Sequence, residues 1–197
     1  MVETRITSWV DRDQELLYFR SKLIDLEDRS HTDNVHFLGF LENIEGADIH
    51  SYLRATLPKL TDITFDPPLE FQRVHRLGPK RQDDANHPRP IIACLLRHVQ
   101  TRQLLQAARA HSSFQLYDLE VRLTDDFSKE TSKHRRAFLA LRPRLCQLNV
   151  KYGLFEPARM WITKNEVARD FYDPDDLQVF LEGFQNQTQS MYTAPSI

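Results

Sequence analysis

Apolar residues recur with a seven-residue period at the start of the chain. The series consists of Trp9, Leu16, Phe19, Leu23 and Leu26. Three of its members are seven positions apart, which is the a/d spacing of supercoiled helices. The surrounding residues 7–30 are rich in charge and contain neither Gly nor Pro, so they predict a helix. The pattern covers two to three heptads, and it suits both a coiled coil and an amphipathic helix packed on its own domain.

Residues 32–125 alternate between the periods of strands and helices. Strands are predicted at residues 34–40, 71–77, 91–96 and 117–123, and helices at residues 48–60 and 101–111. Asp48 is placed to cap the first of these helices. In the last strand, one face is expected to carry Tyr117, Leu119, Val121 and Leu123. The order β-α-β-β-α-β is the ferredoxin-like arrangement, which RNA-recognition domains share with many enzymes and regulatory modules.

A helix with two distinct stripes is predicted after residue 126. Ser128 is a suitable N-cap and Glu130 suits the first turn, while Pro143 should split the helix. Its apolar stripe consists of Phe138, Leu141, Leu145 and Leu148, and its basic stripe of Lys129, Lys133 and Arg136.

The rest of the chain predicts two strands, a short helix and a tail. The strands are expected at residues 153–163 and 166–172, and Asp173 and Pro174 suit the start of the helix. Residues 186–197 predict a disordered tail. The fold class is therefore α+β. Its expected parts are a coiled-coil end at 1–31, an RNA-recognition-like domain at 32–125, a C-terminal domain at 126–185 and the tail.

Length and composition fit a small intracellular protein. The 197 residues, 41% of them hydrophobic, can form one good core or two small ones. The apolar runs are too short for a transmembrane helix, and the first residues lack the features of a signal peptide. Cys94 and Cys146 are the only cysteines, so no disulfide framework is predicted and a reducing compartment is expected.

Charge is distributed in blocks along the chain although the formal net charge is only −2. Residues 71–109 hold 8 Lys+Arg against 2 Asp+Glu (+6), and residues 129–169 hold 10 against 3 (+7). Residues 1–70 hold 7 against 14 (−7), residues 110–128 hold 1 against 4 (−3), and residues 170–197 hold 0 against 5 (−5). Two basic blocks between acidic ones indicate local positively charged surfaces that could bind an anionic ligand.

The sequence contains none of several common catalytic motifs. The patterns GxSxG, GxxxxGK[ST], GxGxxG and HExxH are all absent, and the adjacent Asp125 and Asp126 are better explained as a helix lead-in than as a metal site. No enzyme activity, cofactor or metal site is therefore predicted. Aromatic residues are also sparse where RNA-recognition domains stack bases, because His36 is the one ring expected there. Tyr152 and Phe155 are expected in the core, with platforms for base stacking as the alternative, and Trp161 is expected in the core.

Five stretches, taken in order, resemble one protein family. They are LIDLEDRS…NVHFLGF (23–40), FQRVHRLG (71–78), RPIIACLL…LLQAARA (89–110), DDFSKETSKHRRAF (125–138) and YGLFEPARMWIT (152–163). Together they are similar to the RNA-binding protein encoded by the first open reading frame of LINE-type retrotransposons, a family also called transposase-22. The resemblance covers roughly residues 16–184.

The resemblance implies a parallel trimeric coiled coil, an RNA-recognition-like domain and a family-specific C-terminal domain. KLIDLE (Lys22–Glu27) is similar to the trimer-specifying pattern Arg-apolar-x-x-apolar-Glu, with Lys22 in place of the arginine. The trimer contacts that follow are Leu16, Phe19, Lys22, Leu23, Leu26 and Glu27.

The resemblance also implies sequence-tolerant binding of single-stranded RNA, with single-stranded DNA as an alternative ligand, and nucleic-acid chaperone activity. Carried over position by position, the contacts are Arg73, Arg76, Arg102, Arg109, Lys133, Arg135, Arg136 and Arg159. The adjacent Arg135 and Arg136 would line a cleft between the two domains and reach different phosphates of one strand. The simpler interpretation of this pair is a solvated helix face.

Expected partners are further copies of the chain, as a homotrimer and as higher assemblies on RNA, and the element's reverse transcriptase. The resemblance implies ribonucleoprotein particles in the cytoplasm, with the nucleus as the alternative, and no membrane. A different class of function stays open. The chain would then be a coiled-coil scaffold or host-adopted derivative that has lost most RNA binding, and its acidified surface would bind protein.

Overall fold

The computed structural model describes residues 2–80, 88–164 and 167–192. The chain divides into two compact units, one formed by Asp25–Asp126 and the other by the residues before and after that range. Both units combine helices with an antiparallel sheet, which confirms the α+β class. No helix in the described ranges is both long enough and apolar enough to cross a membrane.

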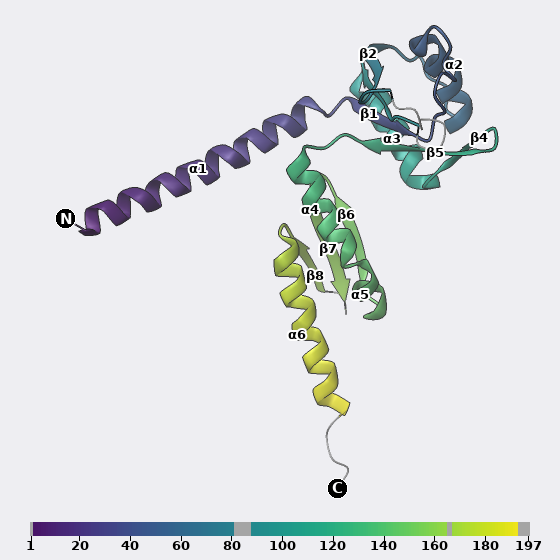
Figure 1. Cartoon of the computed structure of the whole chain (residues 1–197). Coiled ribbons are helices and arrows are strands. Elements are labelled where there is room, and N and C mark those ends of the chain that lie inside the picture. Colours follow the sequence, from purple (N-terminus) through teal and green to yellow (C-terminus); the bar gives the residue numbers. More distant parts are fainter. Residues whose placement is uncertain (1, 81–87, 165–166, 193–197) are drawn as a thin grey trace. The chain divides into compact units, whose positions relative to one another are not determined.

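A single helix, α1 (Val2–Ser30), begins the chain (Figure 1). The predicted helix is thus confirmed and starts earlier than residue 7. Leu16, Phe19, Leu23 and Leu26 are 65%, 52%, 67% and 61% exposed. Within one chain these four side chains are therefore not part of a core. Trp9 belongs to the same series, but its side chain lies outside those that the structure describes.

The unit Asp25–Asp126 is built on a five-stranded sheet in the order β2-β3-β1-β5-β4. Its elements after α1 are β1 (Asn34–Leu38), α2 (Ile49–Thr61), β2 (Phe71–Arg76), β3 (Ile91–Leu95), α3 (His98–His111), β4 (Phe114–Leu116) and β5 (Leu119–Asp125). Every predicted element is present in the predicted order, and β4 is an additional short strand. The predicted loop after β2 falls partly outside the described residues.

Helices α2 and α3 cover one face of this sheet, and the core lies between the helices and the sheet. The buried strand residues are Val35, Phe37, Ile91, Ala93, Leu95, Val121 and Leu123, and the helices add Leu53, Leu57, Leu104, Leu105 and Ala108. Asp48 begins α2 as predicted, since its Oδ1 accepts hydrogen bonds from the amides of His50 (3.0 Å) and Ser51 (3.2 Å).

Tyr117 does not share a face with Val121 and Leu123, contrary to the sequence prediction. Leu116 pairs with Leu119, so Tyr117 and Asp118 form a two-residue turn between β4 and β5. The turn holds Tyr117 at φ 55° and leaves 78% of it exposed. Such hairpin turns need positive φ, which the alternating apolar pattern did not indicate.

The second compact unit contains a three-stranded sheet in the order β6-β7-β8. Its elements are α4 (Lys129–Ala140), α5 (Arg142–Gln147), β6 (Lys151–Phe155), β7 (Arg159–Lys164), β8 (Val167–Phe171) and α6 (Pro174–Tyr192). Pro143 lies in the first turn of α5, so the predicted split of the helix is confirmed. Ser128 caps α4 by accepting from the amide of Thr131 (3.2 Å), and Asp173 accepts from the amide of Asp175 (2.8 Å).

The core of this unit lies between helices α4, α5 and α6 and one face of the three-stranded sheet. The fully or nearly fully buried side chains are Phe138, Leu145, Val150, Met160, Ile162, Leu177 and Leu181. Leu141 and Leu148 pack at its edge, so the apolar stripe predicted for residues 138–148 is confirmed.

Two predictions for this unit are wrong. Residues 153–163 form the end of β6, a turn at 156–158 and β7 rather than one strand, because Pro157 has no amide hydrogen for a sheet ladder. The tail does not begin at residue 186, since α6 continues to Tyr192. No proline follows Pro174 until Pro195, so no strong breaker ends the helix earlier. Residues 193–197 and the predicted connection at 165–166 lie outside the described residues.

We expect Gly39→Ala to destabilise the unit Asp25–Asp126 strongly. Gly39 has φ +85°, and an added Cβ would overlap the carbonyl oxygen of Glu120 on β5. The positive φ alone disfavours alanine by about 1–2 kcal/mol, and the clash with backbone adds to that. Gly46→Ala is the matched control, because Gly46 has φ +62° with no atom within 4 Å of an added Cβ. Urea unfolding should show the larger loss for Gly39→Ala, and equal losses would contradict the close packing of β1 on β5.

Candidate nucleic-acid interface

Arg76, one of the predicted phosphate contacts, is buried in a network of carboxylates and carbonyls. Its side chain is 6% exposed. Its Nε donates to Glu45 Oε1 (2.7 Å), and its terminal nitrogens donate to Glu45, Glu42 and the carbonyls of residues 40, 41 and 89. A guanidinium with its donors engaged in this way is not available for RNA, so Arg76 supports the fold instead.

The two carboxylates of this network are kept ionised by their arginine partners. Arg89 donates two side-chain hydrogen bonds and a backbone one to Glu42 and lowers its pKa, and Arg76 lowers the pKa of Glu45 in the same way. Because the pKa of each carboxyl is lower in the folded state than the unfolded value of about 4.3, its contribution to stability is fully present above about pH 4.3. The contribution is lost as the pH falls through the lowered pKa.

The open face of the five-stranded sheet carries Arg73. In the sheet register Arg73 pairs with Cys94 and His75 with Ile92, so these residues project away from the helices. Arg73 and His75 are both exposed. Burial raises the pKa of the Cys94 thiol against the opposing charge of Arg73, so Cys94 stays neutral. Arg73 is therefore an accessible cation on this face.

His36 and His75 are the ring-bearing strand residues of this open face, and a carboxylate contacts His36. His36 Nε2 lies 3.1 Å from Asp126 Oδ1, and Asn34 Nδ2 donates to Asp126 Oδ2 (2.8 Å). Burial raises the pKa of Asp126, but the hydrogen bonds from His36 and Asn34 outweigh it and lower the pKa overall. His31 Nδ1 is 3.4 Å from the same carboxylate. Even so, no metal-binding group of three or more His, Cys, Asp or Glu occurs among the described residues.

The arginines of α3 do not join Arg73 on the open face. Arg109 donates to Asp125 Oδ1 at 3.1 Å. Asp125 pairs with the buried Val35, so it projects to the side of the sheet that the helices cover. Arg102 is exposed on the same helix. The predicted contacts of this unit therefore lie on two sides of its sheet.

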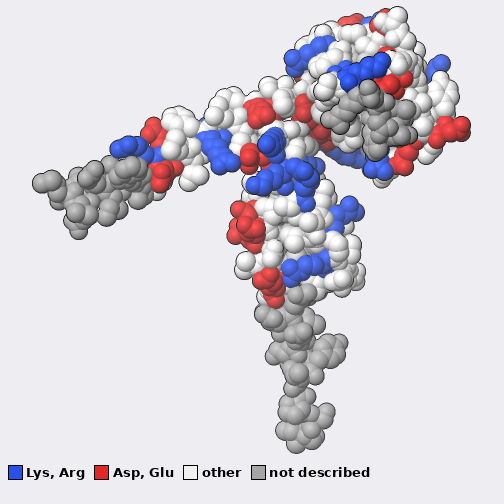
Figure 2. Space-filling view, viewed as in Figure 1, with Lys and Arg blue, Asp and Glu red and all other residues white. Residues whose placement is uncertain are grey.

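Helix α4 carries the clearest accessible basic surface of the second unit. Lys129, Lys133 and Arg136 are exposed and recur every three to four residues, which places them on one helical face. Figure 2 shows Lys and Arg side chains gathered over the N-terminal part of α4. Arg136 donates from its Nε to the carbonyl of Ser132, 3.2 Å away on its own helix. We call Lys129, Lys133 and Arg136 the α4 stripe.

Arg135 has a different environment from its neighbour Arg136. It donates from one terminal nitrogen to the carbonyls of Pro157 (2.7 Å) and Phe155 (3.2 Å), and its guanidinium lies 4.4 Å from the ring centroid of Phe127. Arg135 thus fastens α4 to the β6–β7 turn. The adjacent arginines divide into one that positions a turn and one that faces solvent.

Arg159 begins β7 and lies beside an exposed ring. Its guanidinium donates to Asp170 Oδ1 at 2.9 Å and sits 4.9 Å from the ring centroid of Phe155. It is partly exposed, and its charge is balanced locally by Asp170. The structure therefore brings Arg135 and Arg159 together at the two sides of one turn.

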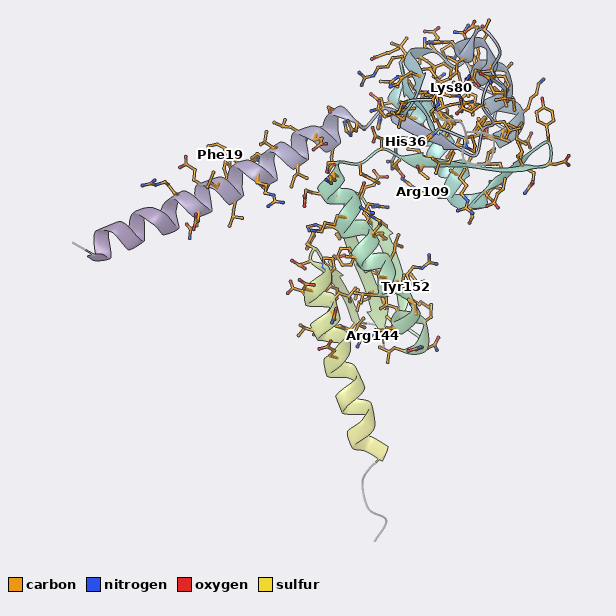
Figure 3. The ribbon with its side chains drawn as sticks, viewed as in Figure 1. Phe19, His36, Lys80, Arg109, Arg144 and Tyr152 are labelled. Atoms are coloured by element: carbon orange, nitrogen blue, oxygen red, sulfur yellow. The ribbon has the colours of Figure 1, made fainter. Side chains whose placement is uncertain are left out.

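The sequence favoured the core for Phe155, with a stacking platform as the alternative, and the core for Trp161, and the structure places both rings outside the core. Phe155 is 47% exposed, and neither ring belongs to the hydrophobic core. Tyr152, labelled in Figure 3, does pack against that core and accepts a hydrogen bond from Arg142 of α5 (3.2 Å). The signal that could have separated them is the period of two along β6, where Tyr152 and Phe155 differ in parity.

We expect Arg76→Ala to destabilise the unit Asp25–Asp126 by about 3–5 kcal/mol, because it leaves Glu45 buried without its partner. Arg73→Ala on the same strand is the control and should stay within about 0.5 kcal/mol of the parent. Urea unfolding at neutral pH measures both losses.

A second measurement repeats the unfolding at decreasing pH. The parent should lose stability as the pH falls through the lowered pKa values of Glu42 and Glu45. Arg76→Ala should show a weaker acid dependence over the same range. Equal stability of Arg76→Ala and the parent would contradict the buried network.

Comparison with known proteins gives one distant relationship. No protein-family model matches the chain. The chain is similar to the LINE-1 retrotransposable element ORF1 protein of Mus musculus, with 24% identity over 163 residues, covering 79% of this chain and 44% of the mouse protein. The chain thus spans less than half the length of this curated relative. The similarity supports a distant relationship between the two proteins.

Proposed function

We propose that the chain is a sequence-tolerant, single-stranded-RNA-binding protein of a LINE-type retrotransposon ribonucleoprotein. Single-stranded DNA is the alternative ligand, and nucleic-acid chaperone activity follows from weak, sequence-independent contacts. The distant similarity to a LINE-1 ORF1 protein supports this proposal. The particles would be cytoplasmic or nuclear, and the element's reverse transcriptase would be a partner.

The observation that carries the proposal is the α4 stripe. Its three cations are exposed, although the whole chain has a formal net charge of −2. A solvated helix on an acidic protein needs no such one-sided stripe, whereas a phosphate backbone binds to one. Arg73, Arg102 and Arg109 would add contacts from the other unit.

We further propose that the unit Asp25–Asp126 is a ferredoxin-like, RNA-recognition-like domain. The strand order β2-β3-β1-β5, with two helices on one face, supports this arrangement. Its open face offers Arg73 but no Phe, Tyr or Trp on the paired strands β2, β3, β1 and β5. Binding there would rest on phosphate electrostatics, with weak sequence preference.

Assembly through α1 completes the proposal. Leu16, Phe19, Leu23 and Leu26 leave an exposed apolar stripe (Phe19 in Figure 3), and a parallel homotrimer would bury it. Lys22 and Glu27 flank the stripe and are exposed, which suits ion pairs between helices. Trimers would assemble further along RNA. Several weak RNA contacts would then act on one strand together, which raises the overall affinity.

The second candidate function is a protein scaffold. It is favoured by the carboxylates that already pair with Arg76, Arg109 and Arg159, and by the net charge of −7 in residues 1–70, where 7 Lys+Arg face 14 Asp+Glu. Fluorescence anisotropy with a labelled RNA strand at about 50 mM and about 200 mM salt separates the two. Tight, salt-sensitive binding supports the RNA function, and no binding at low salt supports the scaffold.

We expect the double variant Lys133→Ala/Arg136→Ala to weaken binding to all RNA sequences alike. Each lost phosphate contact should flatten the slope of log K against log salt by about 0.7 for a single strand. Lys59→Ala, an exposed substitution in the last turn of α2, is the matched control. Thermal melting should match the parent for both proteins. An unchanged affinity and slope in a folded double variant would exclude the α4 stripe as a contact.

We expect the chain to form a parallel homotrimer that dissociates on dilution, because the coiled coil spans few heptads. Light scattering over a concentration series measures the mass. Leu23→Glu should abolish the trimer by placing a carboxylate at the seam, whereas Asp28→Asn, outside the proposed seam, should preserve it. A monomer or dimer at the highest concentration would contradict the assembly.

A further inference from the structure

The three-stranded sheet has one face that its core does not use. Tyr152 and Leu154 of β6 pack against the core, so the intervening Gly153 and the following Phe155 project to the other face. Cross-strand pairs place further residues there: Gly153↔Trp161, Phe155↔Arg159 and Trp161↔Asp170. Lys151 shares this face at the start of β6. Two aromatic rings and two cations therefore lie on one small surface.

Phe155 is held in place by its surroundings although it is 47% exposed. A Cβ on Gly153 would come within 3.1 Å of the Phe155 ring edge, closer than ordinary carbon contact, so glycine gives the ring room to lie along the strand. Arg159 lies 4.9 Å from the ring centroid. Arg135 holds the Phe155 carbonyl at 3.2 Å. The backbone of Phe155 is thus held by Arg135 and its ring contacts Arg159, so the ring loses little freedom when a ligand stacks on it.

Charge on this face selects the kind of ligand. Asp170 balances Arg159 at 2.9 Å, and Glu156 in the adjacent turn is exposed, so this surface has little net positive charge. It is therefore suited to contact bases, whereas the α4 stripe, on the side of the unit away from this face, is suited to contact phosphates. Every base has a flat π-face that stacks on aromatic rings, and Arg also stacks on bases.

We propose that Phe155 and Trp161, with Arg159 beside the Phe155 ring, form a base-stacking platform for single-stranded nucleic acid. The proposal rests on the proposed function and adds to it the group that the second unit contacts. It also predicts that the two contacts respond differently to salt. Stacking on the rings is independent of salt, whereas phosphate binding weakens as the salt concentration rises. On the paired strands β2, β3, β1 and β5, all of them described, the open face has no Phe, Tyr or Trp, and its His36 ring contacts Asp126.

The test compares two labelled strands of equal length, a uridine oligonucleotide and an abasic strand with the same phosphates. Phe155→Leu keeps an apolar side chain but removes the π-face. It should weaken binding to the uridine strand by roughly fivefold to roughly a hundredfold, leave the abasic strand unchanged and leave the salt slope unchanged. Phe155→Tyr should restore binding. Tyr117→Asn, which removes an exposed ring from the β4–β5 turn, is the control and should bind as the parent.

Trp161 gives a direct reading of the stacked state. Only two tryptophans occur in the chain, so Trp9→Phe leaves Trp161 as the single indole. Its fluorescence should be quenched by the uridine strand and not by the abasic strand. The quenching should be lost in Trp9→Phe/Phe155→Leu if the two rings act together.

The outcomes separate this inference from the proposed function. Binding of both strands with equal affinity, unaffected by Phe155→Leu, would overturn the platform and keep the phosphate-based function. A lower melting temperature of Phe155→Leu with unchanged affinity would also overturn the platform. The ring would then serve only to cover Gly153 and stabilise the sheet. Binding of neither strand at low salt would overturn both proposals.

Discussion

In the part of the chain that the structure describes, helices pack on one face of each sheet, and side chains along a strand alternate between the two faces. This constraint decides what a residue can do more than its type does. On β2, a register shift between Phe71 and Arg73 lets Phe71 and Val74 both face the core. It places Arg73 on the open face and Arg76 on the buried one. Two arginines of one strand thereby acquire opposite roles.

The basic residues of the chain consequently form several classes. Arg76 is enclosed by Glu42 and Glu45, Arg135 fastens a turn, and Arg159 is balanced by Asp170. The α4 stripe combines exposure, regular spacing and one helical face. A count of Lys and Arg therefore overstates the phosphate contacts, because guanidiniums with five donors are also the groups that best satisfy buried carbonyls and carboxylates.

The RNA contacts proposed for the second unit are of two physically different kinds and lie on different sides of it. Charge on α4 acts over about a Debye length and is screened by salt, whereas stacking on Phe155 and Trp161 acts only in contact and is not. Neither interaction reads base identity, so together they favour binding along any single strand. The exposed seam of α1 would multiply such contacts by bringing copies of the chain together.

Local signals in the sequence determined most of the elements and their ends. The caps at Asp48 and Ser128, the split at Pro143 and the strand periods depend on interactions within a few residues. Tertiary structure alone decided the burial of Arg76, whose partner Glu45 is 31 residues away, and the exposure of Phe155. Neither the burial of Arg76 nor the exposure of Phe155 could be predicted from composition. Which face of a strand is covered depends on helices that are distant in sequence. The alternation of side chains along a strand separates them into two faces but does not say which face is buried.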